Sequence, residues 1–375
     1  MNYCYFLHPN LFFAELLQKN SERGIIYKVF DSIYCDKGCE KMKTKNNAIE
    51  FYRIIATLII CVHHFKPTGG LHIFTNGYLM VEFFFILSGL FLAQKFDCES
   101  SHSGSKYFFG RLKRLYPEYI LAAVIAIASY SFVGKFDVSK SISEILMVQN
   151  IGMFFGGYNY PCWYISVLVF AGIILYEALK YGKDLFVKVI APVVVLGGYT
   201  YIIHGMENDA GFIWSTQGCI HVQLLRCICG MLTGIIIYHI SKFDFVFKIK
   251  KWIWTLLEII CIAVIAIGIT TYILKIQIIV LGIIGLVFIT YSQCGYIGSK
   301  ILNFNGVSYV SRYSYSLYVN HGILANVFDV MNRNGYLNIG KAEIPVYMLA
   351  LIVYSVITHN VISYISKKIT EKTNK

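Results

Sequence analysis

Long apolar runs alternate with short polar breaks along most of the chain. A helix rises about 1.5 Å per residue, so about 20 apolar residues cross the hydrocarbon core of a bilayer. Gly, Pro, Asn and charged residues gather in the breaks, as in GMENDAG at 205–211 and NRNGYLN at 332–338. The pattern predicts an all-α bundle of about ten transmembrane helices, at 49–66, 74–94, 116–134, 162–180, 186–204, 221–241, 251–273, 275–292, 313–331 and 344–366.

A shorter apolar segment at 145–155 lies between the third and fourth predicted spans, next to GGYNYP. It falls well below the length of about 20 residues that crosses a membrane. We therefore expect a re-entrant or interfacial segment there.

The composition supports a membrane protein. Of the 375 residues, 57% are hydrophobic and only 14% are charged, whereas soluble domains carry about 25% charged residues. The mean hydropathy is +0.58. These values exclude a cytosolic enzyme, a disulfide-rich secreted domain and a disordered chain. The 11 cysteines lie mostly in apolar runs, where a cysteine acts as a small hydrophobe. The cysteines and histidines show no spacing typical of a metal site, so we predict no metal.

The net charge of +12 comes from basic residues that lie mostly in the predicted loops. If the chain starts in the cytoplasm, the loops on the inner side hold most of the Lys and Arg residues and the outer loops hold few. This bias follows the positive-inside rule. It predicts that both termini are cytoplasmic. We expect a multi-pass protein of the inner (plasma) membrane. No nucleic-acid partner is needed to explain the charge.

Residues 1–41 differ from the rest, because they are polar and irregular and show no signal-peptide pattern. Two hypotheses remain open. Translation begins at Met42, which opens MKTKNNAIEFYR, or residues 1–41 form a cytoplasmic amphipathic tail. In either case residues 42–375 are predicted to form one transmembrane domain. Mass spectrometry of the native N-terminus distinguishes the two.

Ionisable side chains inside predicted spans are costly, so each is a candidate functional residue. Arg53 and His64 lie eleven residues apart, so at about 100° per residue they share one helix face and stand about 16–17 Å apart along the axis. Imidazole acts as a general base near neutral pH, and guanidinium binds phosphate or carboxylate. His63 points about 100° away and ranks second. In the alternative interpretation, Arg53 snorkels to the headgroups and His64 caps its helix.

Two more charges lie inside predicted spans. Glu82 lies in the second span, where it either orients His64 or serves as the structural partner of a donor on a neighbouring helix. Arg226 precedes Gly230 and Gly234, whose spacing is the GxxxG pattern of close helix packing. We expect the glycines to pack and Arg226 to face protein, water or a ligand.

Arg111 and Arg114 lie three residues apart, on one helical face, at the predicted cytoplasmic end of the third span. Two arginines in this place either hold a polyanionic cofactor or are ordinary positive-inside residues.

Six segments carry a family pattern in order: FYRIIATLIICVHHF, GYLMVEFFFILSGLFLA, GRLKRLYPEY, CWYISVLVFAGIILY, LLRCICGMLTGIIIY and VSRYSYSLYVNHG. Over residues 46–366 the chain resembles acyltransferase family 3, the transmembrane acyltransferases that modify bacterial surface carbohydrates. The matched positions are Arg53, His64, Glu82, Ser88, Gly89, Arg111, Arg114, Trp163, Ser166, Arg226, Ser314, Tyr315, Tyr318 and His321. The chain departs at Leu168, where many members carry an acidic residue.

The resemblance implies an integral membrane O-acetyltransferase, which transfers an acyl group from cytoplasmic acetyl-CoA to a polysaccharide or lipid-linked glycan. In this scheme Arg111, Arg114 and Arg53 bind the donor, and His64 is the general base, oriented by Glu82. Arg53 is counted with His64 and Glu82 among the catalytic residues. We therefore expect Arg53 and His64 to line a common cavity. The resemblance implies no permanently bound cofactor. Weaker candidates for substrate binding are Trp163, Ser166, Arg226, Tyr315, Tyr318 and His321.

Two other functions stay open. Intramembrane charges and glycine-interrupted spans also occur in transporters and flippases for glycans or small anions. An acyltransferase of another lineage would use the same donor on a lipid or a small natural product. Release of free CoA thiol distinguishes an enzyme from a transporter.

Overall fold

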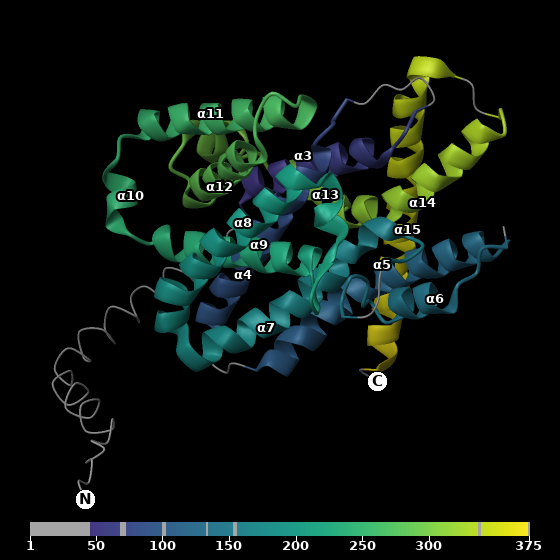
Figure 1. Ribbon diagram of the computed structural model, residues 1–375, viewed down its shortest axis with the longest axis horizontal. Coiled ribbons are helices and arrows are strands. Elements are labelled where there is room, and N and C mark those ends of the chain that lie inside the picture. Colours follow the sequence, from purple (N-terminus) through teal and green to yellow (C-terminus); the bar gives the residue numbers. More distant parts are fainter. Residues whose placement is uncertain are drawn as a thin grey trace, which may run out of the picture.

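The computed structural model describes residues 46–67, 73–99, 103–132, 134–152, 156–336 and 339–373. The predictions for residues 1–41 and Met42 lie outside the described residues. The described chain is a helical bundle with one small hairpin, in which β1 (Thr216–Gln217) pairs antiparallel with β2 (Ile220–His221). In Figure 1, α4 and α9 lie near the centre, α10, α11 and α12 lie to one side, and α5, α6, α14 and α15 lie to the other.

Long helices lie in all the ranges that the sequence predicts as spans. They are α3 (Asn47–His64), α4 (Met80–Cys98), α5 (Gly104–Phe132), α7 (Trp163–Leu185), α8 (Ala191–Asn208), α9 (Val222–Ile240), α11 (Lys251–Thr270), α12 (Ile276–Ser292), α14 (Ser314–Arg333) and α15 (Glu343–Thr373). Short elements connect them: α6 (Val138–Ile145), α10 (Asp244–Lys248), α13 (Val307–Ser311), the 3-10 turns η1 (Gly77–Leu79), η2 (Tyr160–Cys162), η4 (Ala210–Trp214) and η6 (Gly340–Ala342), and the π-helical turns η3 (Phe186–Ile190) and η5 (Ile297–Ile301).

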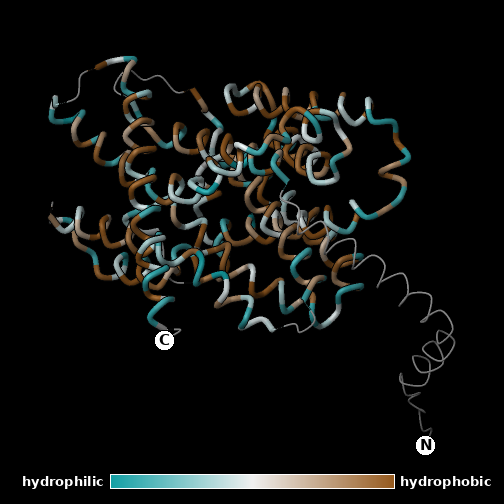
Figure 2. The backbone as a smooth tube through the Cα atoms, turned by 180° about the vertical axis from the view of Figure 1, so that it is seen from behind, coloured by the Kyte–Doolittle hydropathy of each residue, from teal (hydrophilic) through white to brown (hydrophobic). Residues whose placement is uncertain are grey.

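Six of the described segments are long and apolar enough to cross a membrane, and the segment Tyr160–Asn208 contains two of the predicted spans. Helix α12 is apolar but shorter, and α3 and α14 are not among the six. Both carry polar side chains of the site described below. The chain is therefore a helical membrane protein, whereas the count of about ten spans and the side of each terminus stay predictions. Figure 2 shows the apolar character of the helices, with polar residues at connecting segments.

Several predicted boundaries differ from the structure by a few residues, and two differences bear on the fold. The third span was expected at 116–134, but α5 begins at Gly104, because the polar first turns continue the helix. The predicted interfacial segment at 145–155 is not one continuous element. Helix α6 ends at Ile145, and the chain then turns, with positive φ at Met147 and Asn150. Residues 153–155 lie outside the described part.

Glycines let α4 and α9 pack closely. A Cβ on Gly89 would lie 1.8 Å from the Met231 carbonyl oxygen, and one on Gly234 would lie 1.9 Å from the Ile86 carbonyl oxygen. The predicted packing role of the GxxxG pattern is thereby confirmed. This contact brings Glu82 on α4 against Arg226 on α9.

Candidate active site

Arginines from three parts of the chain line one cavity of about 560 Å³. We call it the arginine cavity, and its charged lining residues are Glu50, Arg53, Arg111, Arg114, Glu118, Arg312 and His359. Helix α3 supplies Arg53, α5 supplies Arg111 and Arg114, and Arg312 follows α13. The three arginines that the sequence predicts as donor ligands therefore meet in one place.

Both carboxylates of the arginine cavity already have partners. Glu50 accepts two bonds from Nη1 of Arg53 at 3.0 Å. Glu118 accepts from the Ser316 hydroxyl, and its other oxygen lies 2.8 Å from Nδ1 of His359.

The remaining arginines of this cavity lack acidic partners. Within the described residues, no carboxylate lies at ion-pair distance from Arg111, Arg114 or Arg312. Arg111 donates instead to the Tyr107 hydroxyl at 3.0 Å, and the Arg312 guanidinium lies over the Tyr313 ring, 4.8 Å from its centroid. The cavity thus holds an excess of positive charge that suits a polyanion.

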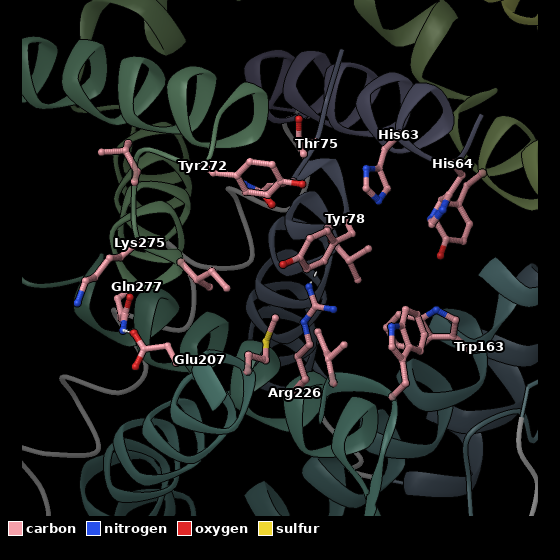
Figure 3. Close-up of a pocket in the computed structure, with 18 residues that line it drawn as sticks. His63, His64, Thr75, Tyr78, Trp163, Glu207, Arg226, Tyr272, Lys275 and Gln277 are labelled. Carbon is pink, nitrogen blue, oxygen red and sulfur yellow. Dashed lines mark hydrogen bonds between the residues drawn. The ribbon is translucent and has the colours of Figure 1, made fainter. Parts of the chain in front are cut away.

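A second cavity of about 510 Å³ contains the imidazoles of α3, and we call it the histidine cavity. Figure 3 shows His63 and His64 on one wall, facing Trp163 and Arg226 across the space. Lys275, Gln277 and Glu207 lie at its far end.

The His64 ring is held on two sides. Its Nδ1 lies 2.5 Å from the hydroxyl oxygen of Tyr160, a residue of η2. Its face stacks on His321 of α14, with ring centroids 5.3 Å apart. His321 is fully buried, and its Nδ1 bonds to the Tyr318 carbonyl oxygen. A fixed Nδ1 leaves Nε2 as the His64 nitrogen that can exchange a proton.

A buried carboxylate fixes the loop that carries Tyr160. Glu144 of α6 is fully buried and accepts from the backbone N–H groups of Tyr158 at 2.9 Å and Asn159 at 2.6 Å. Asn159 in turn donates to the Val319 carbonyl at 2.8 Å. Burial raises the pKa of the Glu144 carboxyl to about 7, although both backbone bonds favour its ionised form.

A model of an acyltransferase domain, that of acyltransferase family 3, matches residues 46–360 of the chain. The match covers most of the protein, including both cavities. The chain belongs to acyltransferase family 3. Its family is one of acyltransferases, and its apolar helices are those of a membrane protein.

Two curated relatives share part of this sequence. A serine/alanine racemase of Enterococcus gallinarum is 26% identical over 145 residues, which are 36% of this chain and 20% of that protein. An amino-acid racemase of Enterococcus faecalis is 26% identical over 171 residues, which are 42% of this chain and 23% of that protein. The chain thus spans less than a quarter of the length of either relative. No solved structure matches.

The structure corrects the expectation that Arg53 and His64 of this acyltransferase line one cavity. Arg53 lines the arginine cavity and His64 the histidine cavity. Of the described residues that line the two, Tyr318 is the one they share. The spacing of Arg53 and His64 on one helix could not predict two cavities, because the ring that borders both, that of Tyr318, belongs to α14.

The orienting role expected for Glu82 is also corrected. Its carboxylate accepts from Nε of Arg226 and, at 2.9 Å, from the hydroxyl of Tyr199, so it is the structural partner of neighbouring helices. Glu82 and Arg226 are both almost fully buried, and a buried ion pair is retained because removing one partner strands the other charge. The side chain at hydrogen-bond distance from the His64 ring is Tyr160, which no sequence motif marks.

The other predicted residues divide between the two cavities. Trp163 lines the histidine cavity, with its ring 5.9 Å from that of Trp214, and Arg226 lines it too. Tyr315 lines the arginine cavity and donates to the Leu115 carbonyl at 2.7 Å. Ser88, Ser314 and Leu168 also line the arginine cavity, whereas Ser166 is fully buried and lines neither.

Four residues of the two cavities were not predicted from the sequence: Arg312, Glu118, His359 and Tyr160. Arg312 falls inside the quoted segment VSRYSYSLYVNHG, so its charge was the available signal. No group of three or more His, Cys, Asp or Glu residues among the described ones is arranged to hold a metal ion.

Proposed function

We propose that this membrane acyltransferase transfers an acetyl group from cytoplasmic acetyl-CoA to a hydroxyl of a cell-surface or exported polysaccharide, such as capsule, O-antigen or exopolysaccharide. The observation that carries the proposal is the pair of cavities. One holds an excess of arginines, the other holds His64, and the Tyr318 ring borders both.

The arginine cavity suits the donor. Coenzyme A carries several phosphate groups, and a guanidinium binds phosphate through a planar fork of N–H donors. Arg111, Arg114 and Arg312 are not neutralised by a carboxylate among the described residues, so they can pair with phosphate at little cost. The thioester arm would then extend along the bundle toward His64.

His64 provides the base for the transfer. When the Tyr160 oxygen accepts from Nδ1–H, Nε2 has a free electron pair that removes the proton from the acceptor hydroxyl. The hydroxyl oxygen attacks the thioester carbonyl, the new C–O bond forms and the C–S bond breaks. The proton held by His64 passes to the departing thiolate, which leaves as CoA thiol.

The histidine cavity has a lining that suits a sugar. Trp163 and Trp214 present aromatic rings, which pack against the apolar faces of sugar rings. At the other end Gln277 donates to Glu207 at 3.0 Å, so amide and carboxylate groups are present to bind hydroxyls.

A second candidate is the transport of a small anion or amino acid through the same two cavities. Part of the chain is similar to a protein named serine/alanine racemase, so serine is the small molecule to test as cargo. In this function the carboxylate of the transported molecule would bind to Arg226 in the histidine cavity and to the arginines of the arginine cavity. No thioester would be cleaved.

One assay separates the two candidates. We expect the purified enzyme to release CoA thiol from acetyl-CoA when a glycan acceptor is present, and a deletion strain to lose an acetyl ester from its surface polysaccharide. Uptake of labelled serine without thiol release would instead support the transporter.

A further inference from the structure

One aromatic side chain stands between the two cavities. Tyr318 lies on α14 and is almost fully buried, yet it lines both the arginine cavity and the histidine cavity. Its hydroxyl donates to the Pro161 carbonyl oxygen at 2.7 Å. This bond ties α14 to the turn η2 that also carries Tyr160.

Rings on both sides hold Tyr318 in place. Tyr164, which lines the arginine cavity, packs edge-on against it with centroids 5.2 Å apart. His321 lies 5.3 Å away on the other side and stacks in turn on His64. The rings of Tyr164, Tyr318, His321 and His64 therefore form a continuous row from one cavity to the base.

We infer that Tyr318 is a barrier that limits the access of water in the histidine cavity to the thioester in the arginine cavity. The inference rests on the proposed function and adds a determinant of acceptor choice to it. His64 removes a proton from water as readily as from an alcohol, so an acyltransferase that joins two open cavities must exclude water by structure.

The barrier makes a specific prediction about the balance between hydrolysis and transfer. In hydrolysis the C–S bond of the thioester breaks and a C–O bond to water forms, so acetate and CoA thiol are released. Tyr318→Leu would open a permanent connection between the cavities. The ratio of acceptor-independent thiol release to acetyl transfer should then rise about tenfold.

Two variants and a control accompany this measurement. Tyr318→Phe keeps the ring and should keep a ratio close to that of the wild type. Tyr164→Leu removes the ring that supports Tyr318 and should raise the ratio, which keeps the test open if Tyr318→Leu does not fold. Tyr238→Leu is the control, because Tyr238 is also buried, donates to Asp97 and lines neither cavity.

A labelling experiment reads the barrier without any acyl transfer. Ser88 lines the arginine cavity, so Ser88→Cys is a reporter there. A membrane-impermeant maleimide added outside intact cells should modify this cysteine in Tyr318→Leu at least about tenfold faster than with Tyr318 present. Peptide mapping separates the reporter from native cysteines.

The two readouts separate the possible failures. If the wild type transfers acetyl but neither Tyr318→Leu nor Tyr164→Leu changes the hydrolysis ratio or the labelling rate, the barrier is wrong and the proposed function stands. If the wild type releases no thiol but Tyr318→Leu exposes the reporter, the proposed function is wrong and a barrier between the cavities remains.

Discussion

At the scale of single residues, the tautomer of His64 is decisive. Nε2 can act as a base only in the neutral form of His64 that carries its proton on Nδ1. The Tyr160 hydroxyl oxygen, 2.5 Å from Nδ1, can accept a hydrogen bond from Nδ1–H and so favour this form. The contact joins residues 96 positions apart, so no local motif could reveal it. In the proposed function, Tyr160 therefore takes the orienting role that the sequence had suggested for Glu82.

Tyr160→Phe should lower kcat about fivefold, because one lost hydrogen bond costs about 1 kcal/mol. The KM for acetyl-CoA should stay unchanged, since Tyr160 does not line the arginine cavity. Steady-state kinetics with both substrates measure the two constants. His64→Ala is the companion variant and should lose activity about 10²-fold or more. If His64→Ala were active and His63→Ala inactive, the base would be His63, and the proposal for His64 would be wrong.

The arginines lead to a second prediction. Arg111→Ala combined with Arg114→Ala should raise the KM for acetyl-CoA about tenfold or more while the KM for the glycan changes little, because charge-assisted bonds to phosphate contribute about 1.5–3 kcal/mol each. Arg333→Ala is the matched control, since Arg333 pairs with Asp329 and lines neither cavity. A donor KM equal to that of the wild type would refute phosphate binding by these two residues.

At the scale of helices, hydropathy predicted where the helices lie but not how they pair. Apolar runs require helices in a membrane, so every predicted span contains one. The pairing of Glu82 with Arg226 spans 144 positions and depends on the glycine contact between α4 and α9, which only the GxxxG spacing hinted at. The extension of α5 back to Gly104 was missed because its first turns are polar.

Gly234→Ala should destabilise the enzyme by about 1–3 kcal/mol, the usual cost of overpacking a tight interface. The added Cβ would lie 1.9 Å from a backbone oxygen of α4, which cannot move without shifting that helix. Gly197→Ala is the control, because a Cβ there meets nothing within 4 Å. Thermal unfolding in detergent compares the two, and equal melting temperatures would contradict the close contact.

Glu144 predicts a pH dependence of stability. Its pKa in the folded protein is about 7, raised from 4.5 by burial. The protonated form is thus favoured by folding, so its stabilising contribution is complete below pH 4.5 and is lost as the pH rises through 7. Glu144→Gln cannot ionise, so the wild type should lose stability relative to this variant on going from pH 5 to pH 8. A melting-temperature difference that stays constant over this range would contradict the shifted pKa.

At the scale of the whole molecule, several loops that are predicted to lie on the same side of the membrane contact one another in the structure. Asp97, which follows the second predicted span, accepts from Lys183 and Lys242 at 2.7 Å each, and these follow the fourth and sixth spans. All three lie in loops predicted to face the cytoplasm. The bond from Gln277 to Glu207 joins the predicted outer end of the eighth span to a loop that is also predicted to lie outside.

These contacts indicate which of the connected segments lie on the same side of the membrane. They do not show which side faces the cytoplasm, and the bias of basic residues predicts that. Cys219 is exposed in the hairpin between β1 and β2, in a loop predicted to be external. An impermeant maleimide should therefore label Cys219 in intact cells, and Cys219→Ser should lose that label. If Cys219 were labelled only after the cells are opened, the predicted orientation of the protein in the membrane would be reversed. The arginine cavity would then face away from the cytoplasmic acetyl-CoA pool, and the proposed direction of acetyl transfer would be wrong.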